Sequence, residues 1–369
     1  MIAAVPREAA ANERRVALVP ESVARFVKLG AAVHVQRGAG TSAAFPDALY
    51  EKAGAEIVDD VATLARDADV VLCVGRPSDE LVSLLRKGTT LAGFFNPLGD
   101  PAYLSRLAGR GLTVLAVESI PRITRAQPMD ALSSQSNIAG YKAVLLAASA
   151  LPRFFPMLTT AAGTIPPAKV FVIGAGVAGL QAIATARRLG AVVSGYDARA
   201  VVKEQVQSLG ASFVEFDAGD AEGSGGYAKE LTQDQLQRQQ RAMAETIGKH
   251  DVVITTALVP GRPAPLIVTA EAVAGMQPGS VVVDLAAENG GNCALTKRDE
   301  TIVTENGVTV IGTTNLASTM PSDASRLYSR NLFALLSPFV KNGALALDEN
   351  DEVVKGACVV RDGKVLTGG

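Results

Sequence analysis

The sequence predicts an α/β protein with two doubly wound domains, each built on a mainly parallel sheet. The chain has 369 residues, and a single hydrophobic core rarely grows beyond roughly 250 to 300 residues, so two domains are expected. Hydrophobic residues make up 48% of the chain and charged residues 20%, which is typical of a folded globular protein. Short apolar runs alternate with stretches of helical period in two separate series, and repeated strand–helix units of this kind form parallel sheets.

The first series occupies the N-terminal third of the chain. Its β-branched, apolar runs predict strands at residues 2–5, 32–35, 70–74, 90–94 and 113–117. Residues 20–29 and 50–54 predict helices, and Gly30 stands where a left-handed cap would end the first of them. We assign residues 1–132 to an N-terminal α/β domain.

A second series begins at Lys169 and predicts strands at residues 170–173, 192–195, 212–216, 252–255, 280–285 and 308–311. An alanine-rich helical stretch near residues 133–160 precedes it. After the last strand, residues 323–341 have helical period and residues 353–360 are apolar. We assign residues 140–322 to a second domain, and we expect residues 323–369 to return and complete the first.

Several classes of function are disfavoured by the bulk properties. The net charge is −2 and no block of like charge occurs, so a nucleic-acid partner is not expected. Cys73, Cys293 and Cys358 are far apart and lack the paired spacing of a metal site or disulfide framework, which fits a reducing cytoplasm. The N-terminus does not resemble a signal peptide, and the most apolar stretch, residues 143–158, is interrupted by prolines and an arginine.

The clearest motif is Gly174-x-Gly176-x-x-Gly179, which follows an apolar strand and leads into a helix. In a Rossmann-like domain the first glycine permits the tight turn, the second lets a pyrophosphate approach the backbone, and the third lets the helix pack close to the strand. Asp197 ends the next strand, where a carboxylate accepts bonds from the adenosine ribose and disfavours a 2′-phosphate. The motif therefore predicts NAD(H) binding, with a plain tight turn as the alternative. Arg199 is interpreted as a surface arginine.

Residues 217–231 contain several glycines and one aromatic residue, Tyr227. A long excursion of this kind is usually either a functional lid or a disordered segment. We interpret it as a lid over bound dinucleotide, with a passive loop as the alternative.

Four stretches resemble a known family closely. They are RITRAQPMDALSSQSNIAGY at residues 122–141, TAAGTIPPA at 160–168, GGYAKE at 225–230 and TTALVPG at 255–261. This pattern is similar to the NAD(H)-binding alpha-1 subunit (domain I) of proton-translocating, Re/Si-specific NAD(P) transhydrogenases, within the alanine dehydrogenase/transhydrogenase family. The resemblance covers essentially the whole chain and implies two Rossmann-like domains with a nucleotide cleft between them.

The resemblance also implies roles for matching residues. Arg122, Gln127, Asp130 and Ser133 match the catalytic polar loop that holds the nicotinamide and its ribose and faces the partner, and Ile123 and Thr124 of that loop match cofactor contacts. Cofactor contacts are likewise matched by Gly174, Gly176, Val177, Gly179, Asp197, Ala198, Arg199, Gly226, Tyr227, Ala257 and Leu258. Pro128 departs from the serine of the family pattern and restricts the residues before it. From spacing alone, the loop is equally well explained as a linker in which Arg122 pairs with Asp130.

Alanine dehydrogenase is the main alternative, because it shares the fold and the pattern of residues 13–17. That enzyme needs a lysine and a histidine in its first domain, and residues 73–77 and 93–97 contain neither. His34 and His250 lie at predicted strands away from the cofactor loops and are interpreted as structural. Hydride exchange between two nicotinamides moves no proton, so it needs no general acid or base in the loop.

The resemblance implies a set of partners. These are an NADP(H)-binding component that receives or donates the hydride, a membrane-spanning component that translocates protons, and a second copy of this chain in a homodimer. No metal is expected. The chain would then be catalytic only with its partners, and it would lie on the cytoplasmic face of the membrane through them. A non-catalytic NAD(H) sensor whose lid signals redox state is a third possibility.

Overall fold

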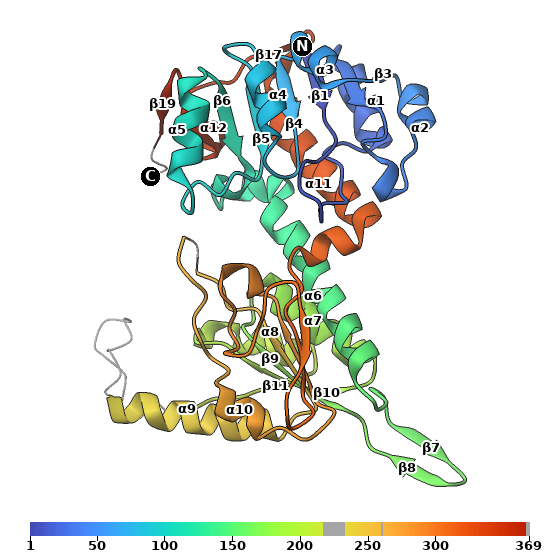
Figure 1. Ribbon diagram of the computed structural model, residues 1–369, viewed down its shortest axis with the longest axis vertical. Coiled ribbons are helices and arrows are strands. Elements are labelled where there is room, and N and C mark those ends of the chain that lie inside the picture. The colour runs from blue at the N-terminus through green and yellow to red at the C-terminus, as the bar shows by residue number, and fades with distance from the viewer. Residues whose placement is uncertain (217–232, 260, 367–369) are drawn as a thin grey trace. The chain divides into compact units, whose positions relative to one another are not determined.

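The computed structural model describes residues 1–216, 233–259 and 261–366. The chain divides into two compact units: unit 1 comprises Met1–Gln135 and Ala317–Gly369, and unit 2 comprises Ser136–Leu316. Each unit contains a sheet flanked by helices, which confirms the predicted α/β class (Figure 1). Among the described residues, no helix is both long and apolar enough to cross a membrane.

The sheet of unit 1 has the order β19-β18-β6-β5-β4-β1-β2-β3 among the described residues. Strands β1 to β6 are parallel, whereas at one edge β18 runs antiparallel to β6 and β19 runs antiparallel to β18. Their bounds are β1 Ile2–Val5, β2 Ala32–Gln36, β3 Glu56–Val58, β4 Val70–Leu72, β5 Thr90–Gly93, β6 Thr113–Ala116, β18 Cys358–Arg361 and β19 Lys364–Val365. The C-terminal segment therefore adds strands to the sheet that the N-terminal segment begins.

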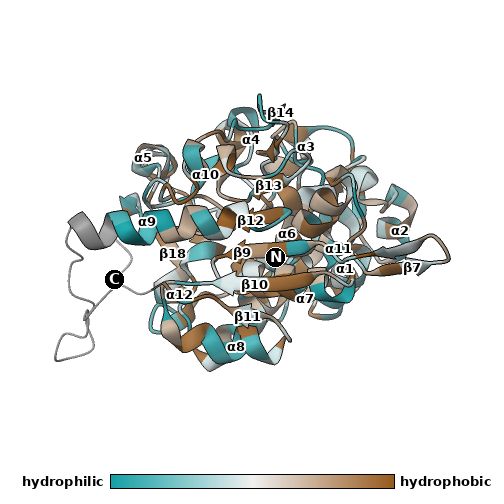
Figure 2. Ribbon diagram, turned by 90° about the horizontal axis from the view of Figure 1, so that it is seen from below, coloured by the Kyte–Doolittle hydropathy of each residue, from teal (hydrophilic) through white to brown (hydrophobic). Residues whose placement is uncertain are grey.

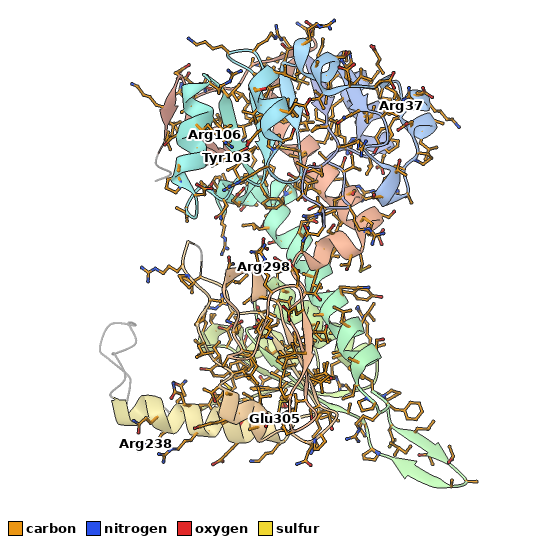
Figure 3. The ribbon with its side chains drawn as sticks, viewed as in Figure 1. Arg37, Tyr103, Arg106, Arg238, Arg298 and Glu305 are labelled. Carbon is orange, nitrogen blue, oxygen red and sulfur yellow. The ribbon has the colours of Figure 1, made fainter. Side chains whose placement is uncertain are left out.

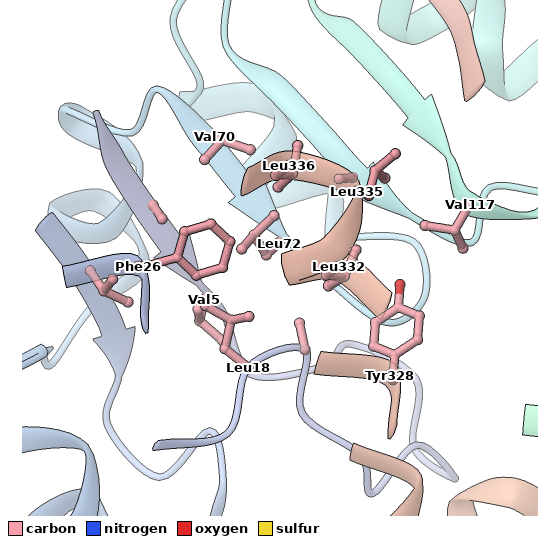
Figure 4. Close-up of a cluster of buried hydrophobic side chains, with 14 of the residues drawn as sticks. Val5, Leu18, Phe26, Val70, Leu72, Val117, Tyr328, Leu332, Leu335 and Leu336 are labelled. Atoms are coloured by element: carbon pink, nitrogen blue, oxygen red, sulfur yellow. The ribbon is translucent and has the colours of Figure 1, made fainter. Parts of the chain in front are cut away.

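Helices cover this sheet and close its core. They are α1 Pro20–Lys28, α2 Asp47–Lys52, α3 Val61–Arg66, α4 Asp79–Leu84, α5 Pro101–Gly109, α11 Pro321–Leu336 and α12 Glu352–Ala357. Gly30, with φ +83°, follows α1 as the predicted left-handed residue. Figure 4 shows Tyr328, Leu332 and Leu336 of α11 among side chains of the first strands, all of them fully buried. A helix near the end of the sequence thus fills the core begun at the start.

Unit 2 has the sheet order β11-β10-β9-β12-β13-β15-β14 among its described residues, parallel except for β14. The strands are β9 Lys169–Ile173, β10 Val192–Tyr196, β11 Ser212–Phe213, β12 Val252–Thr255, β13 Val281–Asp284, β14 Thr301–Val303 and β15 Thr309–Ile311. The helices are α7 Val177–Arg188, α8 Lys203–Ser208, α9 Gln233–Gly248 and α10 Ala270–Ala274. Figure 2 shows β9 and β12 in hydrophobic colours and α8 largely in hydrophilic ones, as expected for a covered sheet.

Three smaller features lie outside the two main sheets. Helix α6 (Ala131–Ala150) corresponds to the alanine-rich stretch and contains the division between the units. Strands β16 (Val340–Lys341) and β17 (Ala344–Leu345) form a short hairpin in unit 1. A second hairpin, β7 (Leu158–Thr160) with β8 (Gly163–Ile165), extends from unit 2 with nearly all its strand residues exposed.

Candidate functional site

The glycine motif lies at the carboxyl end of β9, at the position where the strand order of unit 2 reverses. From β9 the chain continues to β10 and β11 on one side and then returns to β12 on the other. In open α/β sheets, ligands bind outside the carboxyl ends of the strands at this reversal. The motif and the segment that follows β12 therefore occupy the expected place for a nucleotide.

The three glycines of the motif meet different surroundings. Gly174 has φ +95°, and a Cβ there would lie 2.5 Å from Thr256 Oγ1. A Cβ on Gly179 would fall far inside the 3.0 Å that real Cβ atoms respect, against the carbonyl oxygen of Gly174. Gly176 precedes α7, and a Cβ there would meet nothing within 4 Å.

This pattern fits a dinucleotide. Gly174 and Gly179 are required by the fold, whereas Gly176 leaves open space at the N-terminus of α7. The first N–H groups of a helix lack intrahelical acceptors and attract phosphate. Val177 is the first residue of α7 and is 39% exposed. Because the start of the helix is accessible, the motif can hold a pyrophosphate.

Asp197 follows β10 and is tied to the glycine turn. Its Oδ2 accepts a 2.7 Å hydrogen bond from the backbone N–H of Ala175. Arg199 donates through its backbone N–H and Nε to Oδ1 and through its second guanidinium nitrogen to Oδ2, at 2.9 to 3.0 Å. Burial opposes ionisation of Asp197, but these hydrogen bonds outweigh it and hold its pKa below the ordinary value.

Arg199 lies at the surface, as interpreted from the sequence, and its side chain is 60% exposed. It is nevertheless engaged, since it forms a two-point ion pair with Asp197. Ribose hydroxyls that approach this carboxylate would share it with Arg199 or displace Arg199. Ala198, between the two, is exposed.

The segment Thr256–Leu258 continues from β12 and lies against the glycine turn. Thr256 donates from its backbone N–H to Ile173 O at 2.9 Å and from its hydroxyl to Gly174 O at 3.1 Å. Leu258 is 51% exposed. Ala257 is held by Asn292, whose side-chain Oδ1 accepts from the Ala257 N–H at 3.0 Å. Ala257 thus lies beside the glycine turn, and Leu258 is the next residue along the chain.

The polar loop of unit 1 is a 3₁₀ helix, Thr124–Met129, that leads into α6. Asp130 precedes α6, and its carboxylate accepts from the backbone N–H of Ser133 at 2.8 Å and from the Ser133 hydroxyl at 2.6 Å. This is a helix N-cap. Arg122 and Gln127 are exposed, and the described residues of the chain offer neither side chain a hydrogen bond or an ion pair. The alternative in which Arg122 pairs with Asp130 is therefore wrong for this structure.

Asn331 and Asp351, from the C-terminal part of unit 1, hold this loop in place. Asn331 of α11 donates to the carbonyl of Pro128 at 2.8 Å and accepts from the Ser134 hydroxyl at 2.7 Å. Arg125 forms a two-point ion pair with Asp351 at 2.8 and 2.9 Å, and this pairing lowers the pKa of Asp351. Pro128 lies inside the 3₁₀ helix. Ile123 packs on the core of unit 1, and Thr124 is exposed.

The two segments that lack a lysine and a histidine follow β4 and β5 of unit 1. Glu8 binds the first segment, because its carboxylate accepts hydrogen bonds from the N–H groups of Val74 and Gly75 at 2.7 and 3.0 Å. Burial raises the pKa of Glu8 to about 7. In the second, Glu118 accepts from the N–H groups of the residues that follow β5, and burial raises its pKa.

An arginine–tyrosine stack lies beside these carboxylates. The guanidinium groups of Arg76 and Arg106 lie 4.4 and 5.0 Å from the ring centre of Tyr103, and Figure 3 shows Arg106 beside Tyr103. Arg76 also pairs with Asp100 at 2.7 Å. The two arginines, Tyr103 and Asp100 thus contact one another. They do not replace the lysine and the histidine that alanine dehydrogenase needs.

The remaining sequence candidates fall outside the two sites. His34 lies 3.4 Å from Glu56 on the neighbouring strand, and His250 stacks on Phe171 with its ring 5.1 Å away. Burial lowers the pKa of His250. Gly226 and Tyr227, and with them the predicted lid at residues 217–231, lie outside the described residues.

Sequence reasoning missed the residues that support the sites. Asn331 and Asp351 are separated from the loop they hold by 203 and 226 positions. Asn292, which holds Ala257, and Asp284, which bonds Asn292, are fully buried polar residues. A polar residue at the end of an apolar strand, as Asp284 is, was the available signal.

Comparison with known proteins gives consistent matches over the whole chain. The family model "Alanine dehydrogenase/PNT, N-terminal domain" matches residues 4–139, and "Alanine dehydrogenase/PNT, C-terminal domain" matches residues 143–368. The first part of the NAD(P) transhydrogenase subunit alpha of Rhodospirillum rubrum is 46% identical, over 98% of this chain and 97% of that protein.

Solved structures agree. The crystal structure of transhydrogenase from Sinorhizobium meliloti superposes with a TM-score of 0.89 and 47% identity, over 99% of this chain and 100% of that one. An L-alanine dehydrogenase structure superposes with a TM-score of 0.80 and 25% identity, over 99% and 97%.

Proposed function

Because the chain belongs to the alanine dehydrogenase/PNT family and is similar over its length to transhydrogenase alpha subunits, we propose that it binds NAD(H) for hydride exchange with NADP(H) held on a separate component. The observation that carries the nucleotide part is the glycine turn. It is crowded at Gly174 and Gly179 but open at Gly176, beside the carboxylate of Asp197. This carboxylate disfavours a 2′-phosphate and supports NAD(H) over NADP(H) on this chain.

The unit 1 loop is proposed to serve the reacting end of the dinucleotide. The bound nicotinamide supplies the hydride chemistry. Arg122 and Gln127 are exposed and carry hydrogen-bond donors that no described residue uses, so they are available to grip a carboxamide or face the partner component. Asp130 and Ser133 fix the start of α6 and hence the loop's geometry. Positioning of this kind is the main contribution a protein makes to hydride transfer between nicotinamides.

The same proposal has three further parts. They are coupling to proton translocation by a membrane component, a cytoplasmic location through that component, and formation of a homodimer. The exposed β7–β8 hairpin supports a self-association surface, because Ile165 of β8 is 41% exposed and Met157, which directly precedes β7, is 63% exposed. Sedimentation of the purified chain should then report a dimer.

The decisive experiment mixes the chain with an NADP(H)-binding transhydrogenase component and follows reduction of an NAD analogue by NADPH. Exchange that needs both proteins supports the proposal, and exchange no faster than with either alone contradicts it. Alanine oxidation by the chain alone would establish the alanine dehydrogenase alternative. The likeness to L-alanine dehydrogenase favours testing it, although the segments after β4 and β5 lack the lysine and histidine.

A further inference from the structure

Among the described residues of unit 2, the buried carboxylate with the most hydrogen bonds has no role in the proposed hydride exchange. Asp284 is the last residue of β13 and is 0% exposed. It stands in parallel register beside Thr255, the last residue of β12, whose hydroxyl donates to Asp284 Oδ1 at 2.9 Å. A charged group buried this completely must be satisfied by hydrogen bonds, and its bonds therefore determine the local chain path.

Those bonds fold the segment after β13 back onto the strand end. Oδ1 also accepts from the Ala286 N–H at 2.9 Å. Oδ2 accepts from the N–H groups of Asn292 and Cys293 at 2.7 and 3.0 Å, and from the Thr296 hydroxyl at 2.7 Å. Three of these donors are backbone N–H groups, which can only donate, so both oxygens of Asp284 act as hydrogen-bond acceptors.

The carboxylate thereby holds Asn292, which is also 0% exposed. The Asn292 side chain binds the backbone of Ala257 from both sides. Its Nδ2 donates to Ala257 O at 2.9 Å, and its Oδ1 accepts from Ala257 N at 3.0 Å. Nδ2 also donates to Pro265 O at 2.8 Å. The amide thus gives Ala257 the pair of bonds that a neighbouring strand would have given it.

Ala257 lies next to the phosphate turn. Thr256 is bonded to Gly174 O, and a Cβ on Gly174 would lie 3.4 Å from the Ala257 nitrogen. β12 has ended at Thr255, and only Thr256 still bonds Ile173 O of β9. Among the described residues, the hydrogen bonds of Ala257 come from Asn292, and Leu258 beyond it is half exposed. The conformation of the segment against the turn therefore depends on Asn292.

We propose that Asp284 and Asn292 are positioning residues for the dinucleotide: the buried carboxylate orients the asparagine, and the asparagine holds the Ala257–Leu258 backbone against the glycine turn. This inference rests on the proposed NAD(H) binding. A segment freed from Asn292 would have to be ordered when the ligand binds, and fixing the backbone of about one residue corresponds to roughly a tenfold loss of affinity.

The test compares two substitutions in the full chain. Asn292→Ala removes the bonds to Ala257, whereas the control Thr304→Val removes the hydroxyl that bonds Asn306 and Val308 in the β14–β15 turn and none of the bonds to Asp284, Asn292 or Ala257. NADH affinity is measured by fluorescence titration, and the melting temperature is measured in parallel. We expect Asn292→Ala to raise the Kd for NADH roughly tenfold, and Thr304→Val to lower the melting temperature while leaving the Kd unchanged. Equal Kd values for Asn292→Ala and the wild type would overturn the inference, as would equal Kd increases in both variants.

Asn292→Asp keeps the shape of the side chain and provides a test if the alanine variant does not fold. An ionised aspartate cannot donate to the Ala257 carbonyl, but a protonated one can. We expect its NADH affinity, relative to the wild type, to improve as the pH falls. A Kd equal to that of the wild type at every pH would overturn the inference. Failure of the wild type itself to bind NADH would instead contradict the proposed function.

Discussion

One added methyl group should have opposite effects on stability and NADH binding at Gly176 and at Gly179. In Gly176→Ala the new Cβ meets nothing within 4 Å, and the backbone angles of φ −77° and ψ −166° are open to any residue. In Gly179→Ala the new Cβ collides with the backbone carbonyl of Gly174. Because that obstacle is backbone, α7 or the turn itself must move.

The magnitudes follow from these surroundings. Overpacking of this kind costs about 1–3 kcal/mol or more, of which alanine's better helix propensity recovers at most about 1 kcal/mol. A net loss near 2 kcal/mol would lower the melting temperature of a unit of this size by roughly 4–8 °C. Gly176→Ala should cost only about 0.5–1 kcal/mol, because alanine is a poorer N-cap than glycine. Its methyl group occupies the space left for the pyrophosphate, so NADH affinity should fall about tenfold, or ~1.4 kcal/mol.

Calorimetry and NADH fluorescence titration on both variants separate the two effects. The expected result is a stable Gly176→Ala protein that binds NADH poorly, and a destabilised Gly179→Ala protein. Wild-type affinity in Gly176→Ala would refute the placement of the pyrophosphate. Wild-type stability in Gly179→Ala would refute the packing argument.

Three further perturbations test other regions of the molecule. Asp197→Ala should weaken NADH binding about tenfold, because hydrogen bonds to a charged group contribute ~1.5–3 kcal/mol; an unchanged Kd by titration would reject its ribose role. Asp130→Asn and Arg122→Ala should slow hydride exchange in the reconstituted assay more than they weaken NADH binding, and exchange at the wild-type rate in both would show that the nicotinamide lies elsewhere. Glu8 has a pKa of 4.5 when unfolded and about 7 when folded, so its contribution is complete below pH 4.5 and is lost as the pH rises through 7. The wild type should therefore lose roughly 3 kcal/mol relative to Glu8→Gln between about pH 4 and pH 8 in urea unfolding, and parallel pH profiles would contradict this.

The succession of the main strands along the chain was predictable, because these strands are short apolar runs with clear periodicity. Shorter elements were not. Helices α3 and α4 have six residues each, too few for a periodic pattern, although Asp60 and Ser78 cap them in the expected way. Strand β3 has three residues and only one buried side chain, and β14 is antiparallel with exposed residues. Such elements are determined by their neighbours in the sheet more than by their own composition.

The candidate site shows the same division. The glycine turn and Asp197 are local, since a strand, a turn and a helix follow one another in the sequence, and Gly174 and Gly179 have the surroundings their motif predicts. The supports of the unit 1 loop come from residues more than two hundred positions away, and spacing cannot reveal them. From spacing alone Asp130 could pair with Arg122, whereas in the structure Asp130 caps α6 and bonds Ser133.

The connectivity of unit 1 has a consequence for biosynthesis. Unit 2 is one uninterrupted stretch, whereas unit 1 lacks α11 and β18 until residues 317–366 have also been synthesised. Domains generally fold as units during translation, in the order in which they become complete. Here that order is inverted, so the second unit can fold while the first still exposes the apolar surface that Tyr328 and Leu332 will cover. A chaperone that acts on the nascent chain would then bind the N-terminal segment of unit 1, whose apolar surface is still uncovered.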